Sequence, residues 1–525
     1  MNNWSEGYFT ESTYTYGYYR ELSPNFMRWC LMLKGIAAPE ITEDSCHCEL
    51  GYGQGLSANI HAAATLGKFF GTDFNPAHAA QANEFLSASG ANAKFFEDNF
   101  EEFSKREDLP QFDSIGFHGI WTWVSAENRR HMLEVARHHL KSGGMLYNSY
   151  NCLPGWAPNA PLRELLVLHD KYQRAGNADE RVAAAFKFVE DLIAAEPVYA
   201  SRVPGFKSFF DDIKTKDAHY IAHEYLNLDW DLMYFADVAE LCQEFKLDFA
   251  MTAIPIETNE GMYLSEKARE FLKAVSNPIM REQLKDYFIN RQFRKDIFVR
   301  GVRRLSSTET YDKIFSTRYV LMMPAASVPM KVKVHQSELN LNEERYRPVI
   351  EYLEKDNFCP KDFREYLAAE NTNPIFLFEV ILVLIHAGHI VPCQSENAVK
   401  QVKRACERLN AHICERAEFS GDIAFLASPL TGCGVEVSRF NQIFLAQYKS
   451  GLKSADKLAA AAWKILSRNG ERMVVEDKQK LSNENGELSR PRKVLETPEE
   501  NVAHLKTLAE KFLERLPVMR ALMLA

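Results

Sequence analysis

The chain has 525 residues, more than one hydrophobic core usually supports, so we expect roughly three or four domains of ordinary length. Hydrophobic residues make up 46% and charged residues 25% of the chain. These are ordinary proportions for globular proteins, which excludes a disordered or fibrous class. The net charge of -9 and the lack of a run of basic residues argue against a nucleic-acid partner.

The ten cysteines show no C-x-x-C spacing, so we expect reduced thiols in a cytoplasmic protein. Residues 1–19 lack a basic start and an apolar core and are not expected to form a signal peptide. The longest apolar runs, such as residues 374–388, are shorter than the roughly 20 residues that span a bilayer. We therefore expect a buried helix there and no membrane insertion.

Short apolar runs alternate with helical patterns between residues 43 and 151. This alternation is typical of a doubly wound α/β sheet. The expected strands are residues 45–50, 68–74, 92–98, 112–119 and 144–151. The helix before the last of these is expected to end at the glycine pair Gly143 and Gly144.

The pattern changes after the fifth expected strand. Residues 158–222 carry helical periodicity and few strand signals, which indicates a helical insertion. Residues 223–260 read as a helix followed by a strand, which would complete the sheet as an edge or antiparallel strand. Residues 261–330 form a charged middle region, in which residues 291–304 read as an amphipathic helix with solvated arginines.

The remainder, residues 331–525, is predominantly helical in pattern. Residues 327–336 alternate apolar and polar side chains, as a half-buried strand does. Residues 476–491 form a polar loop, and residues 499–516 form a terminal amphipathic helix.

A glycine-rich turn, residues 49–55, directly follows the first expected strand. Its glycines are Gly51, Gly53 and Gly55. Glycine has no Cβ and tolerates positive φ, so the backbone here can approach a ligand closely. The dinucleotide fingerprint would need a small residue at position 56, where this chain has Leu56. Taken alone, the turn is weak evidence for a nucleotide site.

Polar side chains end the next three strands. Asp73 follows the second strand, where a carboxylate can accept hydrogen bonds from both ribose hydroxyls of an adenosine. Asp98 follows the third, where it can accept from an adenine amino group, and His118 ends the fourth. Each is, singly, more often a solvated loop residue or a helix cap. Because these strand ends meet in one crevice, together they predict an adenosyl site.

No metal site is expected. His131, His138 and His139 share one helical stretch, but no carboxylate or cysteine is arranged with them as a ligand set. A surface helix accounts for them.

Several segments resemble known methyltransferase motifs. "ELGYGQG", "TDFNP", "EDNF" and "LKSGGMLYNSYNCLPGW" are similar to motifs of class I S-adenosylmethionine-dependent methyltransferases that carry a methyltransferase regulatory domain. "HEYLNLDWDLMYFADVAELCQEF" and "REQLKDYFINRQFRKDIF" resemble that regulatory domain. The resemblance covers residues 40–305, and its most specific part is Ser149 to Trp156. More weakly, the C-terminal third resembles the winged-helix C-terminal domain of the rickettsial-type protein lysine methyltransferases of outer-membrane protein B.

The resemblance implies a fold, a cofactor and an assembly. It implies a Rossmann-like class I methyltransferase sheet that binds S-adenosyl-L-methionine, and a homodimer formed through the helical insertion. The implied cofactor contacts are Glu49, Gly51, Tyr52, Gly53, Gly55, Asp73, Phe74, Asp98, Asn99 and His118. The tyrosine-rich stretch Thr13 to Leu22 replaces a Pro-rich stretch that the family leads us to expect.

The resemblance also implies a domain plan. The expected parts are the first part of the S-adenosylmethionine-binding core (1–157), a helical insertion that forms the dimer (158–222), the completion of the core sheet (223–260), a regulatory-like middle region (261–330) and a C-terminal domain that is winged-helix-like and then helical (331–525).

Methyl transfer is an in-line displacement, so the protein mainly positions the nucleophile. A lysine nucleophile, with a free pKa near 10.4, must first lose a proton, and burial beside the cationic sulfonium lowers its pKa. We expect Tyr150 and Trp121 to border the acceptor site and His118 or Tyr147 to tune it. Ordinary packing of these aromatic side chains, together with Trp123, is an equally good explanation.

Three functions remain open on the sequence. The first is a protein-lysine N-methyltransferase that acts on a bacterial protein, favoured by the extra domains. The second is a methyltransferase for a small molecule or another side chain. The third is a noncatalytic cofactor-binding interaction module.

Overall fold

The structure is a computed structural model. It describes residues 15–173, 175–203, 205–216, 221, 224–225, 227, 229–370, 372–476, 481–482, 488–489 and 492–525. The expectation for the first 14 residues, and most of the expected polar loop 476–491, lie outside the described residues.

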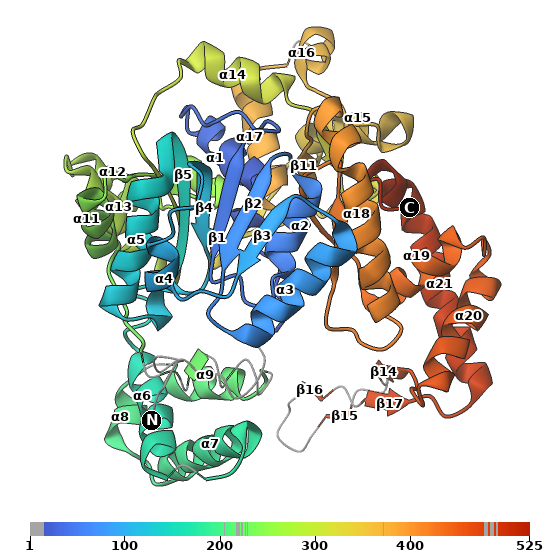
Figure 1. Ribbon diagram of the computed structural model, residues 1–525, viewed down its shortest axis with the longest axis horizontal. Coiled ribbons are helices and arrows are strands. Elements are labelled where there is room, and N and C mark those ends of the chain that lie inside the picture. Colours follow the sequence, from blue (N-terminus) through green and yellow to red (C-terminus); the bar gives the residue numbers. More distant parts are fainter. Residues whose placement is uncertain are drawn as a thin grey trace.

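A seven-stranded sheet forms the centre of the molecule (Figure 1). Its strands are β1 (Cys46–Leu50), β2 (Lys68–Thr72), β3 (Ala93–Phe96), β4 (Phe112–Phe117), β5 (Leu140–Asn151), β6 (Asp248–Thr252) and β7 (Phe293–Val299). The order across the sheet is β3-β2-β1-β4-β5-β7-β6. The first five strands pair in parallel, whereas β7 runs antiparallel to both β5 and β6. The expected Rossmann-like α/β class is confirmed.

Strand β7 corrects the helix expected over residues 291–304. The strand pairs with β5 over seven residues and with the edge strand β6. Helical spacing of its apolar residues was misleading, because Arg294 and Asp296 are fully buried charged residues rather than a solvated face. The sheet is therefore completed partly by residues 293–299 and not by residues 223–260 alone.

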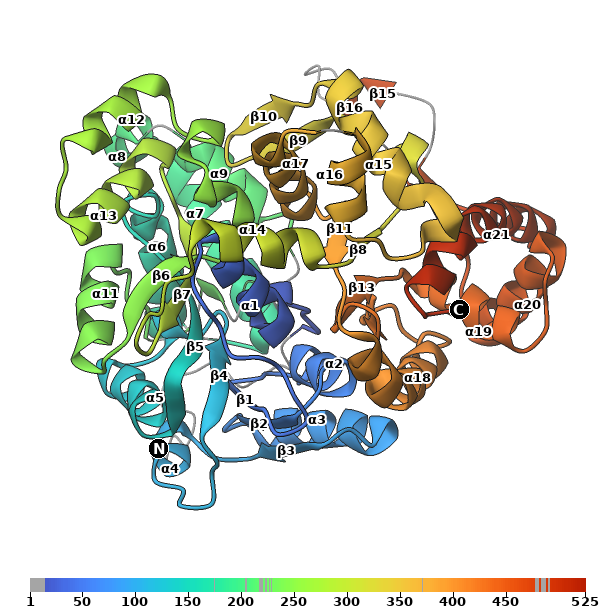
Figure 2. The same ribbon diagram turned by 90° about the horizontal axis from the view of Figure 1, so that it is seen from above.

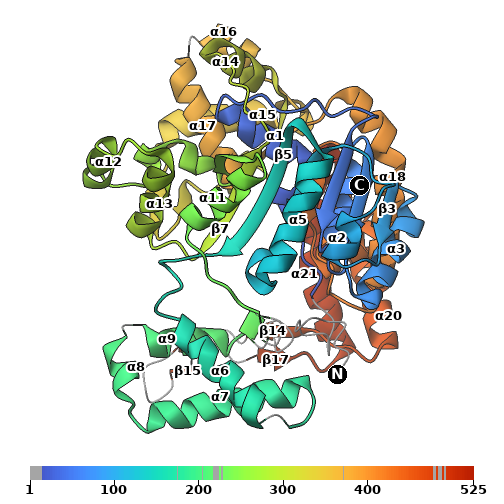
Figure 3. The same ribbon diagram turned by 60° about the vertical axis from the view of Figure 1, so that its left-hand side comes forward.

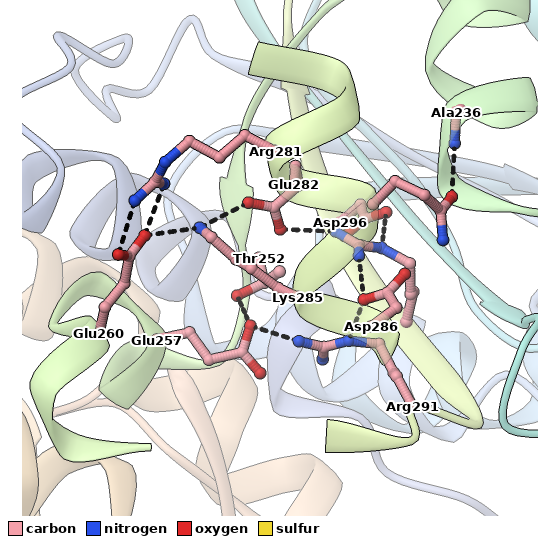
Figure 4. A network of polar contacts seen from close by, with 12 residues as sticks. Ala236, Thr252, Glu257, Glu260, Arg281, Glu282, Lys285, Asp286, Arg291 and Asp296 are labelled. Atoms are coloured by element: carbon pink, nitrogen blue, oxygen red, sulfur yellow. Dashed lines mark hydrogen bonds and ion pairs between the residues drawn. The ribbon is translucent and has the colours of Figure 1, made fainter. Parts of the chain in front are cut away.

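The buried charges of β7 belong to an ion network with helix α13 (Pro278–Ile289). Arg294 donates to Asp286 at 2.6 Å, to Glu282 at 3.0 Å and to Asp296 at 2.8 Å. Arg291 donates to the same Asp286 at 2.7 Å (Figure 4). Because the carboxylates and guanidinium groups satisfy one another, the strand can carry charge inside the core.

The glycine pair does not end the preceding helix. Helix α5 (Ala126–His139) begins at the N-cap Ser125 and ends at His139, because Leu140 already has an extended backbone. Gly143 and Gly144 lie inside β5. The end of this helix was therefore expected five residues too late, which is a boundary error.

Helices cover both faces of the sheet. Helices α1 (Pro24–Leu33), α2 (Leu56–Ala64) and α3 (Pro76–Ser89) lie on one face. Helices α4 (Phe100–Ser104), α5 and α11 (Phe235–Glu244) pack on the other, around Phe103, Leu133 and Val238. The carboxyl ends of β1 to β4 are left open between these layers.

The helical insertion stands apart below the sheet (Figure 3). Its helices are α6 (Ala160–Gln173), α7 (Ala178–Ala194), α8 (Val198–Arg202) and α9 (Phe206–Ile213). It has a small core of its own, in which Leu162, Val189, Phe206 and Phe210 are buried. It follows β5 directly in the chain, so it lies beside the open strand ends.

The last part of the chain packs beside α2 and α3 (Figure 2). Helix α18 (Glu396–Arg416) makes this contact. The other elements are α12 (Glu266–Lys273), α14 (Ser307–Ser316), β8 (Tyr319–Leu321), β9 (Lys331–Val334), β10 (Ser337–Asn340), α15 (Glu343–Phe358), α16 (Arg364–Glu370), α17 (Pro374–His386), β11 (Ile390–Pro392), β12 (Phe425–Ser428), β13 (Cys433–Glu436), α19 (Arg439–Lys449), α20 (Ala455–Arg468), β14 (Val474–Glu476), β15 (Leu481–Ser482), β16 (Leu488–Ser489), β17 (Arg492–Val494) and α21 (Pro498–Ala521). Short 3-10 turns are η1 (Arg20–Leu22), η2 (Trp121–Trp123), η3 (Pro255–Thr258), η4 (Glu260–Met262) and η5 (Ala325–Ser327).

Three elements expected in this last part of the chain are confirmed, whereas its domain character is not tested. The expected strand appears as β9, and the expected terminal helix appears as α21. The apolar run of residues 374–388 forms the buried helix α17, and no helix in the described part of the chain is long and apolar enough to cross a membrane. The winged-helix character of residues 331–525 and the other domain bounds remain predictions.

Candidate active site

A cavity of about 460 Å³ lies at the carboxyl ends of β1 to β4. The ten side chains and glycines that the sequence nominated for cofactor binding all line it: Glu49, Gly51, Tyr52, Gly53, Gly55, Asp73, Phe74, Asp98, Asn99 and His118. Four strand ends thus meet in one crevice, where ligands of open α/β sheets bind. Which of these residues contact the cofactor remains a proposal.

The three glycines of the loop after β1 have positive φ. A Cβ on Gly51 would lie 2.1 Å from Ile120 Cδ1, and one on Gly55 would lie 2.5 Å from the Ala82 Cβ. A Cβ on Gly53 would meet no described atom within 4 Å. Two glycines therefore let the loop pack tightly, and the third exposes its backbone to the open cavity.

Asp73 ties the end of β2 to this glycine loop. Its Oδ2 accepts from the Gly53 amide at 2.9 Å, and its Oδ1 accepts from the Asn75 amide at 3.0 Å. His78 Nδ1 lies 3.1 Å from Oδ1. The carboxylate is buried, at 6% exposure, yet lines the cavity. It is therefore held in one orientation, as a group that receives two vicinal hydroxyls must be.

Glu49 lies beside Asp73, at the end of β1. Burial and the nearby Asp73 charge raise the pKa of Glu49 to about 8. A pKa near 8 favours the protonated form of this carboxyl group at neutral pH. A cationic ligand would favour the ionised form, so the Glu49 carboxyl group would lose its proton when such a ligand binds.

The third strand end supplies Asp98 and Asn99. Asp98 Oδ2 accepts from Arg106 Nη1 at 2.9 Å, and the Asp98 amide donates to Thr72 Oγ1 at 3.2 Å. Asn99 caps helix α4 by accepting from the Glu102 amide at 2.8 Å. Asn99 is therefore a helix cap that also lines the cavity.

His118 is enclosed by aromatic groups at the end of β4. Its Nδ1 lies 2.8 Å from the Tyr147 hydroxyl, and its ring stacks on Tyr19 with centroids 3.7 Å apart. Burial lowers the pKa of His118 to about 3. The imidazole is therefore neutral at physiological pH and is a weak base.

Residues 15–19 of the N-terminal stretch form one wall of the cavity. Thr15, Gly17 and Tyr19 line it. The Tyr19 amide donates to Ser57 Oγ at 2.9 Å, and the Ser57 hydroxyl donates to the Gly17 carbonyl at 3.3 Å. The stretch is thereby fastened along the start of α2. The tyrosines of this stretch are visible in the sequence, but nothing local in the sequence places them over the sheet, so no site residue was expected there.

Trp121 and Tyr150 do not border the cavity, which corrects the acceptor site expected from the sequence. Trp121 is fully buried and stacks on Phe117, with centroids 5.7 Å apart. The Tyr150 hydroxyl donates to Asp296 Oδ2 at 2.7 Å, inside the ion network of β7. Both side chains point into the core. Tyr150 does so because alternate residues of β5 face opposite sides of the sheet, and Trp121 does so from the 3-10 turn η2.

The cavity continues toward the insertion, where its lining becomes aromatic and acidic. The additional lining residues are Trp123, Asn128, Asn151, Trp156, Glu224, Asn227, Asp229, Gln292 and Phe293. Of these residues only Trp123 was a candidate from the sequence, and the others were not expected at the site. The segment Ser149 to Trp156, its most specific motif, was the available signal for Asn151 and Trp156.

This motif turns the chain from β5 into the insertion. A Cβ on Gly155 would lie 2.2 Å from the Arg291 carbonyl oxygen, and the Gly155 amide donates to that oxygen at 3.0 Å. Only glycine fits this approach of two backbones. The turn places Asn151 and Trp156 on the cavity wall. Within the described residues, no group of three or more His, Cys, Asp or Glu side chains could hold a metal ion.

Comparisons with known proteins agree with this geometry. A methyltransferase domain model matches residues 48–144, and a predicted methyltransferase regulatory domain model matches residues 217–300. Uncharacterized protein sll1526 of Synechocystis sp. is 34% identical over 526 residues, which cover 99% of both chains. Uncharacterized protein RP789 of Rickettsia prowazekii is 27% identical over 304 residues, 56% of this chain and 53% of that one.

Among solved structures, PKMT2 from Rickettsia typhi in complex with AdoHcy superposes with a TM-score of 0.67 at 17% identity. The match covers 96% of this chain and 99% of PKMT2. Together, these matches and the strand order show that the chain belongs to the same family as sll1526 and is a class I S-adenosylmethionine-dependent methyltransferase with a methyltransferase regulatory domain.

Proposed function

We propose that the protein is a protein-lysine N-methyltransferase that acts on a bacterial protein. The observation that carries the proposal is the acidic and aromatic far end of the cavity, where Glu224, Asp229, Trp123 and Trp156 line one passage. Carboxylates attract a lysine ammonium group, and aromatic faces hold cations. The fold shared with PKMT2 of Rickettsia typhi supports the same class.

The lining residues support one orientation of the cofactor in this proposal. The ribose hydroxyls would meet Asp73, which is already fixed by Gly53 and Asn75. The adenine would lie toward Asp98 and the methionyl part toward Glu49, both of which line the cavity. In this arrangement the sulfonium faces the passage toward Trp123 and Trp156. S-adenosylmethionine supplies an electrophilic methyl group on that sulfonium.

The residues of the chain would then orient the amine and manage its charge. Glu224 and Asp229 would attract the protonated lysine, and the amine would lose its proton to solvent water before attack. Burial beside a positive sulfonium lowers the pKa of the amine. His118, with a pKa of about 3, would act as a neutral positioning residue rather than as the base. Positioning alone can supply much of the rate, as in other displacement reactions.

The test is transfer of label from methyl-labelled S-adenosylmethionine into a bacterial lysate. The proposal expects label in protein, and acid hydrolysis is expected to release methylated lysine. Label confined to small molecules would favour the second function, a small-molecule methyltransferase. Cofactor binding without transfer to any acceptor would favour a noncatalytic module. Asp73→Asn, which should lose cofactor affinity, is the negative control.

We also propose a homodimer formed through the insertion and a reducing, cytoplasmic location. Exposed apolar side chains on α6 and α8 support the dimer: Leu168, Tyr172, Val198 and Tyr199. The ten cysteines are all unpaired, which fits a reducing compartment. Sedimentation equilibrium of the wild type and of Tyr172→Ser with Val198→Ser tests the dimer. A monomeric wild type at micromolar concentration would contradict it.

A further inference from the structure

A second cavity, of about 520 Å³, lies on the side of β7 that faces the C-terminal part of the chain. Its walls come from η1, the residues that follow β6, β7, β9 and the end of α17. The charged and titratable residues that line it are Arg20, Glu21, Lys295, Lys331, Lys333, His335, His386 and His389. The volume is within the range of small-ligand sites, roughly 300 to 1,000 Å³.

The lining is strongly basic, although the whole chain carries a net charge of -9. Arg20, Lys295, Lys331 and Lys333 are opposed by a single lining carboxylate, Glu21. Glu21 is bound to Lys295 at 2.7 Å, and these neighbouring cations lower the pKa of Glu21 to about 2. The cavity therefore holds a surplus of three positive charges at neutral pH, before any histidine is protonated.

Two neighbouring carboxylates reduce this surplus without removing it. Glu257 lies 3.0 Å from the lining residue His335, but it is also paired with Arg291 at 2.8 Å. Lys331 pairs loosely with the exposed Glu338 at 3.5 Å, whereas Lys333 has no ion-pair partner among the residues that the structure describes. Helix α17 ends at the cavity, and Arg20 Nη1 donates to its Ile385 carbonyl at 3.3 Å. A helix C-terminus contributes about half a negative charge, so the cationic side chains still dominate.

One buried group points independently to a ligand. His389 is 8% exposed and lines the cavity. Within the described part of the chain its Nδ1 has no hydrogen-bond partner, although it is buried. Buried polar atoms are almost always paired. The neighbouring His386 uses its Nε2 on the Lys333 carbonyl at 3.2 Å, so this part of the wall is ordered.

We propose that this cavity is a binding site for a small phosphorylated anion. Arg20 and Lys333 would donate charged hydrogen bonds to the phosphate oxygens. Nδ1 of His389 is shielded from solvent, so the imidazole would turn toward the cavity before this atom donates a further one. Hydrogen bonds between charged partners are the strongest in proteins. An acidic protein segment is the less favoured occupant, because the surplus of charge is concentrated in a cavity of small-ligand size.

The site adjoins the wall of the cofactor cavity. Arg20 and Glu21 directly follow Tyr19, which stacks on His118. On the strand side, Lys295 lies opposite Ser149 of β5, and the Ser149 hydroxyl accepts from the Gly119 amide at 2.9 Å. Gly119 lines the cofactor cavity. A bound anion that attracts the side chain of Lys295 or Arg20 would therefore shift the residues next to His118, through Tyr19 on one side and through Ser149 and Gly119 on the other. If anion binding changes cofactor affinity, cofactor binding must change anion affinity by the same factor.

Isothermal titration of the full-length chain with pyrophosphate, at constant ionic strength, tests the site. We expect saturable binding that persists when the cofactor cavity is filled with S-adenosylhomocysteine. Lys333→Gln should weaken it at least about tenfold, since a charged hydrogen bond is lost. His389→Phe should also weaken it. Lys267→Gln, a change of another exposed lysine on α12, should leave it within about twofold.

Lack of saturable binding, or equal binding by the wild type and Lys333→Gln, would overturn the proposal. Loss of binding on filling the cofactor cavity would overturn it as well, because pyrophosphate would then occupy that cavity. Lys333 is exposed, so its substitution should not prevent folding, and unchanged circular dichroism checks this. The proposal does not rest on the identity of the methyl acceptor. A change in the dissociation constant for S-adenosylhomocysteine with pyrophosphate, absent in Lys333→Gln, is the expected sign of coupling.

Discussion

The ring of Tyr19 stacks on the imidazole of His118, with centroids 3.7 Å apart and an angle of 22° between the ring planes. One residue comes from the N-terminal stretch and the other from the end of β4. The contact closes one wall of the cofactor cavity. The Tyr147 hydroxyl lies 2.8 Å from Nδ1 of His118 and fixes the imidazole from another side. The N-terminal stretch is therefore part of the cavity wall.

Replacing Tyr19 with alanine should weaken cofactor retention. A stacked aromatic pair contributes about 0.5–1.5 kcal/mol, so we expect the dissociation constant for S-adenosylhomocysteine to rise about two- to twelvefold. Tyr19→Phe keeps the ring and should change it less than twofold. Stopped-flow fluorescence and calorimetry on the two variants measure this. Equal affinities of wild type and Tyr19→Ala would show that the stretch does not help to hold the cofactor.

Replacing Asp73 with asparagine should reduce cofactor affinity about ten- to a hundredfold. Asp73 lines the cavity, and backbone amides donate to both of its carboxylate oxygens. Hydrogen bonds to a charged group contribute about 1.5–3 kcal/mol. Asp108→Asn, which removes an exposed carboxylate paired with Arg106, is the matched control. Calorimetry that gives the same affinity for Asp73→Asn and Asp108→Asn would remove Asp73 from the cofactor site.

Gly53→Ala and Gly51→Ala should behave differently. An added methyl group on Gly53 enters open cavity space, so cofactor binding should suffer more than stability, which positive φ lowers by about 1 kcal/mol. An added methyl group on Gly51 would meet Ile120 Cδ1 at 2.1 Å, so folding itself should suffer. Urea unfolding and cofactor titration of each variant separate the two effects. Full cofactor affinity in Gly53→Ala would place the ligand elsewhere.

Cofactor affinity should depend on pH through Glu49. Burial and the charge of Asp73 raise the pKa of Glu49 to about 8, and the positive charges of S-adenosylmethionine would favour its ionised form. Binding therefore releases a proton below pH 8. The dissociation constant should rise as the pH falls from about 8, by up to about tenfold per pH unit. Calorimetry between pH 6.5 and 9 should give a flat profile for Glu49→Gln; a flat profile for the wild type would contradict the assignment.

Tyr150→Phe should affect stability rather than turnover. The Tyr150 hydroxyl donates to the buried Asp296, which retains Arg294 at 2.8 Å. Losing this bond should lower the free energy of unfolding by about 1–3 kcal/mol, with kcat/KM within about twofold of the wild type. Tyr147→Phe, which removes the partner of His118, should lower activity more. If Tyr150→Phe kept full stability but lost turnover, Tyr150 would be assigned to the acceptor site after all.

The sequence predicted the part of the site that depends on local pattern. Each cofactor candidate lies at or just after the carboxyl end of a strand, and parallel strands bring these ends together whatever the rest of the chain does. Two features could not be predicted from the sequence: the buried strand β7 and the position of Tyr19. β7 appeared helical because Arg294 and Asp296 neutralise each other inside the core, and sequence alone does not show partners. The position of Tyr19 depends on contacts with Ser57 and His118, which are distant in the chain.

Tyr150 and Trp121 were expected at the site from the sequence, but the structure places them in the core. Both are aromatic residues near strand ends, which made them good candidates for a cation site. Strand register decides which side chains face the cavity, and it turns Tyr150 toward Asp296. A single residue's type and approximate position therefore do not identify an acceptor-site residue.

A crystal structure of the full chain grown with S-adenosylhomocysteine tests the central claim most directly. The account predicts the adenosyl group in the cavity between Gly53 and His118, with both ribose hydroxyls within hydrogen-bond distance of Asp73. The sulfur should face the passage lined by Trp123, Trp156 and Glu224. An adenosyl group bound elsewhere, or a sulfur atom facing away from that passage, would contradict it.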